Sequence, residues 1–502
     1  MKSKFRRLSD RWPDQYLRTY CSRCYCWILL LLLDDVYHMS PSSKTTSLVL
    51  LLLGLVYVTH GGPALPDRPF NIVWNVPSRK CAEKFGVEFD LDEYDIVSNP
   101  GQEWNGTYVT IFYEKNLGLY PKIHEPTGQD INGGIPQEAD IEAHIAKATD
   151  DIYRLIPDAD YQGLGVIDFK PWRPLWNRNW DSKKNIYRVK SEDLVRQTSP
   201  YASKAEVTSK AKEEFEGAAR MWMGKTLSLV KTLRPGGFWG FYLFPDCYNS
   251  PEEIKLRQGT SYDCTKEVKS DNNRLQWLWE GSTGLYPNIY LTSVFKTLPS
   301  SEQFVRARVA ETFRVMDGRQ SSSIPVYPYV RLRYRDSMEC LAKADLISSI
   351  QEAAGQGSAG VVIWGASADV NSKENCVSLR DYVTSTFGPF AKEMTSQAAD
   401  CSRRECSSHG RCVTYYEKAS NDEPVKTDRS GLVQEGVQKA VQMTSEPPGS
   451  AAQQEQQSHE QVISREYASW FGEKLQYLPG RQGTLCRCYP GWTGERCSEQ
   501  TN

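Results

Sequence analysis

The sequence contains little histidine and almost no net charge. Its histidines are His38, His60, His124, His144, His409 and His459. None of them sits with cysteine or carboxylate residues at the spacing of metal ligands, so we expect neither a catalytic metal nor another cofactor. The net charge of −2 over 502 residues favours no particular partner, so we do not expect nucleic acid to be one. Any attraction for an anionic polymer must therefore come from local arginines.

The sequence also lacks an apolar run long enough to cross a bilayer comfortably. The run at 48–58, LVLLLLGLVYV, follows Lys44 and precedes Gly61 and Gly62, a pattern typical of a signal peptide. We predict a secreted, extracellular protein with no stable membrane span, in which residues 1–62 are an N-terminal extension and signal peptide. Met39 would be an ordinary start for this signal, so residues 1–38 are either an upstream extension or a gene-model artefact. The alternative is a signal anchor that makes a type II membrane protein.

The cysteines are distributed unevenly and divide the chain. Three lie in the N-terminal extension; of the other eleven, five are spread over residues 81–376 and six are crowded into 401–497. With 40% hydrophobic residues, the chain can form one large domain and a small module. We predict these as 63–398 and 399–502. A polar stretch rich in proline and glutamine predicts a disordered insertion at about 416–465.

Short apolar segments alternate with amphipathic ones through the larger domain. We predict strands at 70–76, 108–113, 163–169, 238–244, 286–291, 326–332 and 360–365. Apolar residues three and four positions apart predict a helix at 141–155. This alternation indicates an α/β fold, a distorted (β/α) TIM-type barrel, whose functional side chains gather at the C-terminal strand ends. Polar and aromatic candidates follow these ends: Tyr113, Asp168, Tyr242, Asp246, Tyr248, Tyr290 and Trp364.

The stretch GLGVIDFKPWRPLWNRNW, residues 163–180, is the most informative. Asp168 and Lys170 are two apart on a strand and therefore face the same side. The following Trp172, Arg173, Trp176 and Trp180 supply the flat apolar surfaces and the forked donor that bind sugar rings and carboxylates. One interpretation is a carbohydrate site; the other is an ion pair that only supports the barrel.

This stretch closely resembles the catalytic segment of animal hyaluronidases, a family of hyaluronan-degrading glycoside hydrolases, and the resemblance covers roughly residues 66–500. Where the family carries its proton-donating glutamic acid, this sequence has Lys170. Lysine, with a reference pKa of about 10.4 against about 4.3 for glutamic acid, is a much weaker acid. The resemblance implies that the N-acetyl oxygen of the substrate attacks the anomeric carbon while Asp168 orients that amide.

Other segments resemble the family in local context and imply further roles. Tyr242 and Tyr290 would steady the N-acetyl group or the leaving sugar, Trp364 would form a floor, and Arg173 or Arg308 would meet carboxylates. The implied substrate-binding residues are Tyr113, Trp172, Arg173, Asp246, Tyr248, Arg308, Glu311 and Trp364. Asn105, in an Asn-x-Thr sequon, is a predicted glycosylation site.

The tail around CYPGWTGERC resembles an epidermal-growth-factor-like (EGF-like) module, whose small core requires disulfides. The two resemblances together imply five disulfides: Cys81 with Cys376, Cys247 with Cys264, Cys401 with Cys412, Cys406 with Cys486, and Cys488 with Cys497. Cys340 is left over as an unpaired thiol.

Two functions remain open. The first is endo-hydrolysis of β-1,4 N-acetylhexosaminide bonds in hyaluronan or chondroitin by a substrate-assisted retaining mechanism, impaired by Lys170. The second is a catalytically inactive relative that binds the same polysaccharides. In either case we expect a monomer. A weaker possibility is an adhesion or fertilisation-type surface protein that acts through the C-terminal module.

Overall fold

The computed structural model describes residues 68–180, 182–316, 324–414 and 483–501. The predicted signal peptide and the predicted disordered insertion lie outside these residues. Within the part of the chain that is described, no helix is both long and apolar enough to cross a bilayer.

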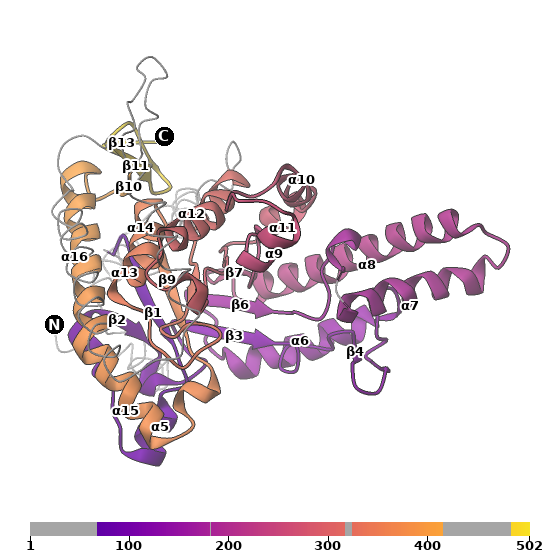
Figure 1. Cartoon of the computed structure of the whole chain (residues 1–502), viewed down its shortest axis with the longest axis horizontal. Coiled ribbons are helices and arrows are strands. Elements are labelled where there is room, and N and C mark those ends of the chain that lie inside the picture. The colour runs from indigo at the N-terminus through magenta and orange to yellow at the C-terminus, as the bar shows by residue number, and fades with distance from the viewer. Residues whose placement is uncertain (1–67, 181, 317–323, 415–482, 502) are drawn as a thin grey trace, which may run out of the picture. The chain divides into compact units, whose positions relative to one another are not determined.

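Seven strands form two parallel sheets at the centre of the fold (Figure 1). The first has the order β2-β1-β9-β8: Ile96–Ser98, Asn71–Asn75, Gly360–Trp364 and Tyr329–Val330. The second has the order β3-β6-β7: Val109–Tyr113, Leu164–Asp168 and Phe238–Phe241. Five of the seven predicted strands are therefore present as strands, with shifts of a residue or two at most ends.

The two sheets are joined into a distorted barrel at two irregular seams. On one side, isolated parallel bridges connect Tyr242 with Tyr286, Leu285 with Val326 and Asn288 with Tyr329. On the other, the buried side chain of Asn99 bonds to the backbone of β3, donating to the carbonyl of Val109 at 2.8 Å and accepting from the N–H of Tyr108 and Val109.

Two strand predictions need correction at the first seam. The segment 286–291 pairs only through isolated bridges, and 326–332 contracts to the two residues of β8. Pro287, Pro325 and Pro328 are the physical reason, because proline has no N–H to give to a continuous ladder.

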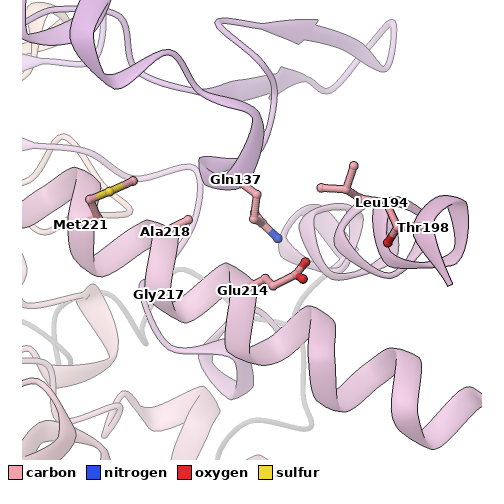
Figure 2. A pocket seen from close by; sticks show the side chains of 7 residues that line it. All are labelled: Gln137, Leu194, Thr198, Glu214, Gly217, Ala218 and Met221. Carbon is pink, nitrogen blue, oxygen red and sulfur yellow. The ribbon is translucent and has the colours of Figure 1, made fainter. Parts of the chain in front are cut away.

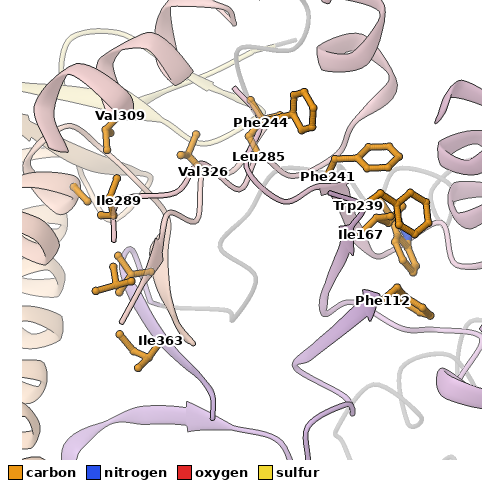
Figure 3. Packing of buried hydrophobic residues seen from close by; sticks show 14 of the residues in the cluster. Phe112, Ile167, Trp239, Phe241, Phe244, Leu285, Ile289, Val309, Val326 and Ile363 are labelled. Carbon is orange, nitrogen blue, oxygen red and sulfur yellow. The ribbon is translucent and has the colours of Figure 1, made fainter. Parts of the chain in front are cut away.

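Side chains alternate between the two faces of every strand. Those facing the barrel interior share one cluster, formed by Val73, Val97, Val109, Ile111, Leu164, Val166, Tyr242, Tyr286, Tyr327, Tyr329, Ala359 and Val362. Their neighbours face the surrounding helices; Figure 3 shows Phe112, Ile167, Trp239 and Ile363 among these outward side chains. Because Leu164 and Val166 face inward, the period of two also turns Asp168 into the barrel.

Helices surround the strands (Figure 1). The α-helices are α5 Arg79–Phe85, α6 Ile141–Leu155, α7 Ser182–Thr198, α8 Lys204–Leu233, α9 Pro251–Leu256, α10 Lys266–Arg274, α11 Gln276–Gly281, α12 Pro299–Arg314, α13 Lys343–Leu346, α14 Glu352–Gly355, α15 Lys373–Tyr382 and α16 Gly388–Glu405. Two π-helical segments, η7 Ile347–Gln351 and η9 Val383–Phe387, continue α13 into α14 and α15 into α16. Short 3₁₀ helices are η1 Asp92–Tyr94, η2 Pro100–Gln102, η3 Pro136–Glu138, η4 Trp176–Arg178, η5 Ser293–Phe295 and η8 Ser367–Val370.

Helix α6 contains the apolar residues whose spacing predicted a helix, and it is capped by Asp140, whose carboxylate accepts from the N–H of Ala143 at 2.9 Å. Helix α8 was not predicted. It begins at a capping box formed by Ser203 and Glu206, and it forms a helical hairpin with α7 (Figure 1). A small antiparallel pair, β4 Lys122–His124 with β5 Gln129–Ile131, follows β3.

The C-terminal segment contains two antiparallel pairs: β10 Gly410–Thr414 with β11 Thr484–Cys488, and β12 Trp492–Thr493 with β13 Glu499–Gln500. β10 packs against α14 and α16, and Arg411 donates to the carbonyl of Pro69 at 2.9 Å. The structure forms the same five disulfides that the resemblances implied: Cys81–Cys376, Cys247–Cys264, Cys401–Cys412, Cys406–Cys486 and Cys488–Cys497. Cys340 is unpaired among the described cysteines.

Candidate functional site

The centre of the site is an ion pair at the end of β6. Lys170 Nζ lies 2.7 Å from Asp168 Oδ2. The Asp168 side chain is 4% exposed, whereas that of Lys170 is 53% exposed, so the aspartate faces the interior and the ammonium faces solvent. The second oxygen of Asp168, Oδ1, is buried and has no hydrogen-bond partner among the described residues. Its capacity to accept a hydrogen bond is therefore not used by any described group of the protein.

Burial sets the protonation behaviour of this pair. Loss of water raises the pKa of Asp168, and the nearby positive charges of Lys170 and Arg173 oppose that rise. The ammonium of Lys170 also lies 5.0 Å from the ring centre of Tyr242, where a cation is attracted to the aromatic face. Lys170 is thus held by one carboxylate and one ring.

Aromatic side chains extend from this pair; Tyr242 is buried, and the others are half-buried. Tyr242 and Tyr290 have ring centres 6.3 Å apart, and Tyr290 stacks on Trp364 at 6.0 Å with an interplanar angle of 22°. The indole of Trp364 donates to the Tyr113 hydroxyl at 3.0 Å. Trp104 stacks on Tyr113 at 6.3 Å. We call Trp104, Tyr113, Tyr290 and Trp364 the aromatic floor.

Strand register places these residues together. Tyr113 on β3 pairs directly with Asp168 on β6, and both end their strands at the same edge of the sheet. Tyr242 follows β7 directly, and Asn288 donates to its hydroxyl. Burial raises the pKa of the Tyr242 phenol, and the negative charge of Asp168 adds to the rise, so this hydroxyl stays protonated. It can therefore donate a hydrogen bond to a ligand.

A second charged pair lies next to Tyr242. Arg308 on α12 lies 3.2 Å from Asp246 Oδ1 and donates to the side chain of Asn249 and to the carbonyl of Asn288. Glu311, one turn further along α12, is 3% exposed, and it pairs with Arg314 and accepts from Asn272. Glu311 therefore lies within an internal network behind Asp246.

The tryptophans after Lys170 have different surroundings. Trp172 is 2% exposed, stacks on Tyr120 and donates to the carbonyl of Pro121. Trp176 is also buried, whereas Trp180 is exposed. Arg173 is buried, and it donates to the carbonyl of Lys170 at 3.2 Å. Trp172 and Trp176 thus belong to the hydrophobic core.

The remaining candidates lie at the edges of this region. Arg178 lies over the ring of Tyr248 at 4.5 Å, and burial raises the pKa of Tyr248 to about 12. Asn105 is partly buried and accepts from the N–H of Ile111. Among the described residues, no cluster of three histidine, cysteine or carboxylate side chains could hold a metal ion.

One hollow, of about 510 Å³, lies between η3 and the α7–α8 hairpin (Figure 2). Its lining residues are Gln137, Leu194, Thr198, Glu214, Gly217, Ala218 and Met221. The lining includes no residue of the ion pair or of the aromatic floor.

Residues 59–501 match the family model described as hyaluronidase. The chain belongs to the hyaluronidase family. It is 39% identical to human (Homo sapiens) hyaluronidase-1, over 90% of this chain and 97% of that protein. It is 35% identical to the hyaluronidase of Crotalus adamanteus, over 93% and 98% of the two chains. The solved structure of bee venom hyaluronidase in complex with a hyaluronic acid tetramer matches with a TM-score of 0.60 at 32% identity, covering 65% of this chain and 99% of that chain.

The sequence analysis did not identify three residues of this site. Trp104 lies in a loop outside any strand, and Asn288 lies in the proline-interrupted seam. Arg331 follows β8 and lies over Trp364, with its guanidinium carbon 5.5 Å from the ring centre. The strand-end rule could have found Arg331 only if the end of β8 had been placed correctly.

Proposed function

We propose that this chain binds hyaluronan or chondroitin at the barrel mouth, and that it hydrolyses β-1,4 N-acetylhexosaminide bonds slowly because Lys170 stands in the proton donor's place. Membership of the hyaluronidase family supports the reaction class. The observation that supports impaired hydrolysis is the ion pair between Lys170 and Asp168, whose Nζ and Oδ2 atoms lie 2.7 Å apart.

The site retains what a substrate-assisted reaction needs apart from the acid. Asp168 presents a buried, unpartnered Oδ1 that can accept from the amide N–H of an N-acetyl group and so aim the carbonyl oxygen at the anomeric carbon. The protonated Tyr242 hydroxyl can donate to the same sugar. The aromatic floor offers flat surfaces for sugar rings.

Lys170 opposes the reaction in two ways. Its ammonium is a much weaker acid than a carboxylic acid, so it transfers a proton to the leaving oxygen poorly. It also places a positive charge where positive charge develops on the sugar, and its bond occupies one oxygen of Asp168. Binding without efficient cleavage follows from both effects.

Lys170→Glu tests this proposal, with Lys170→Gln as the matched control. Glutamic acid beside the buried Asp168 restores a carboxylic acid, since two neighbouring carboxyl groups resist ionising together. We expect hyaluronan cleavage between pH 4 and 7, measured in substrate gels and by reducing ends, to rise by about 10² to 10⁴ in Lys170→Glu. Lys170→Gln removes the charge without adding an acid, so it should show no such gain.

Asp168→Asn in the Lys170→Glu background completes this test. It should abolish the gain, because a neutral amide orients the N-acetyl group less well. A wild-type protein that cleaves as fast as hyaluronidase-1, with no gain in Lys170→Glu, would mean that another residue donates the proton.

The second candidate is a polysaccharide-binding relative without hydrolytic activity, which the same ion pair favours. It predicts that wild type binds hyaluronan while Lys170→Glu gains no activity.

The finer features of the chain are also part of this proposal. We infer a secreted monomer with a signal peptide in residues 1–62, a catalytic-type domain at 63–398 and an EGF-like module at 399–502, glycosylated at Asn105. The five disulfides support an oxidising compartment.

A further inference from the structure

Arg331 extends from the end of β8 to the edge of the aromatic floor. Its guanidinium carbon lies 5.5 Å from the ring centre of Trp364, which itself stacks on Tyr290. Nη2 lies 3.3 Å from each carboxylate oxygen of Asp369. The side chain is 12% exposed, so this cation is held in a defined place beside a ring suited to a sugar.

The bonds to Asp369 leave part of the Arg331 guanidinium unused. Nε is buried and has no hydrogen-bond partner among the described residues, and Nη1 makes only a long contact of 3.5 Å to the carbonyl of Arg335. An arginine offers five N–H donors in a fork that fits a carboxylate with two parallel bonds. Nε and Nη1 lie on different sides of the guanidinium, so these remaining N–H groups can give a charge-assisted hydrogen bond to one more carboxylate.

The local charge also remains unbalanced. Asp369 faces two guanidinium groups, because Arg333 Nε lies 3.6 Å from its Oδ1, and it already accepts from the N–H of Ala366 at 2.7 Å. One carboxylate against two arginines leaves an excess positive charge. By contrast, Lys170 has Asp168 and Arg308 has Asp246 as a carboxylate of its own.

We propose that Arg331 is a specificity-determining residue that binds a uronate carboxylate of the polysaccharide. This inference rests on the proposed function and identifies the chemical group of the polysaccharide that Arg331 binds. Hyaluronan and chondroitin alternate an N-acetylhexosamine with a uronic acid, so a chain whose N-acetyl sugar lies at Asp168 carries a carboxylate on each adjoining sugar. A polymer without carboxylates lacks the group that Arg331 binds.

The test compares hyaluronan oligosaccharides with the same oligosaccharides after chemical reduction of their carboxyl groups to alcohols. Binding of each to the intact protein is measured by calorimetry for wild type and for Arg331→Gln. We expect Arg331→Gln to weaken hyaluronan binding by about tenfold or more, as for loss of a charge-assisted bond. Reduction should weaken wild-type binding by a larger factor than it weakens binding to Arg331→Gln.

Two variants control for structural damage. Arg380→Gln on α15 removes an exposed arginine that pairs with Asp381, and it should bind both ligands as wild type does. Arg331→Lys keeps the charge next to Asp369 but loses the fork, so it should bind hyaluronan with an affinity between those of wild type and Arg331→Gln. Thermal unfolding of each variant verifies that it is folded.

The outcomes separate this inference from the proposed function. If wild type binds hyaluronan and Arg331→Gln binds it equally well, or if reduction weakens both proteins by the same factor, the assignment of Arg331 is overturned while the proposed function stands. If wild type binds neither hyaluronan nor chondroitin, the proposed function fails and the assignment fails with it.

Discussion

His144 is expected to make the fold lose stability in acid, independently of the site. The ring lies on α6, is completely buried and packs 4.0 Å from the Trp222 ring centre. Nδ1 accepts from the N–H of Leu119 at 3.0 Å. Thr226 donates its own proton to the carbonyl of Trp222, so it accepts from Nε2 at 3.0 Å. The neutral imidazole satisfies both contacts, and a proton on Nδ1 would face another N–H.

The magnitude follows from the pKa. Burial lowers the pKa of His144 from 6.5 to about 4, although the negative charge of Asp151 partly opposes this. At about 1.36 kcal/mol per unit, the shift corresponds to about 3 kcal/mol. Because the folded pKa lies below the unfolded one, only the unfolded chain binds the proton within this range. Stability is therefore complete above pH 6.5 and falls as the pH drops towards 4.

The assay is the midpoint of urea unfolding for wild type and His144→Gln at half-unit steps from pH 7.5 to 4. Glutamine can accept from Leu119 and donate to Thr226 but does not titrate in this range. It should be less stable at pH 7.5, and the difference from wild type should shrink by about 3 kcal/mol on acidification. Burial favours a higher pKa for Asp151, but the bonds from Lys147 and Arg154 outweigh it and lower the pKa. The stability change linked to this carboxyl group therefore falls below the pH range of the assay.

His124→Gln is the matched control, because His124 is exposed. Parallel curves for His144→Gln and wild type would refute the reasoning, since they would mean that His144 binds its proton equally in both states.

Two further predictions concern the seam and the cysteines. Asn99→Ala should lower the free energy of unfolding by about 2 to 4 kcal/mol, because it removes the acceptor of the Tyr108 N–H and of the buried Val109 N–H. An unchanged urea midpoint would show that β2 and β3 need no side-chain link. Cys340, whose pKa is raised by burial, should react slowly with a thiol reagent in the native protein and fully after denaturation. Mass spectrometry that finds label on Cys81 or Cys376 would contradict the disulfide pattern.

The local sequence pattern alone was sufficient to predict the residues of the site that lie at the ends of strands. The period of two along β3, β6 and β9 turns Tyr113, Asp168 and Trp364 to the barrel interior whatever surrounds them. Parallel strands share one C-terminal edge, so these residues had to lie near one another. Helix α6 was equally predictable, since its apolar spacing and its Asp140 cap are both local.

Tertiary structure decided what local pattern leaves open. An aromatic residue in a loop can serve the core or the surface, and only packing against Tyr120 and Pro121 places Trp172 in the core while Trp104 joins the floor. The sequence by itself determined which side chains of a strand face the barrel interior. It also determined that Lys170 lies beside Asp168. The pairing of Arg331 with Asp369 and Trp364 depended on the folded barrel, because charge balance and burial arise between elements far apart in the chain.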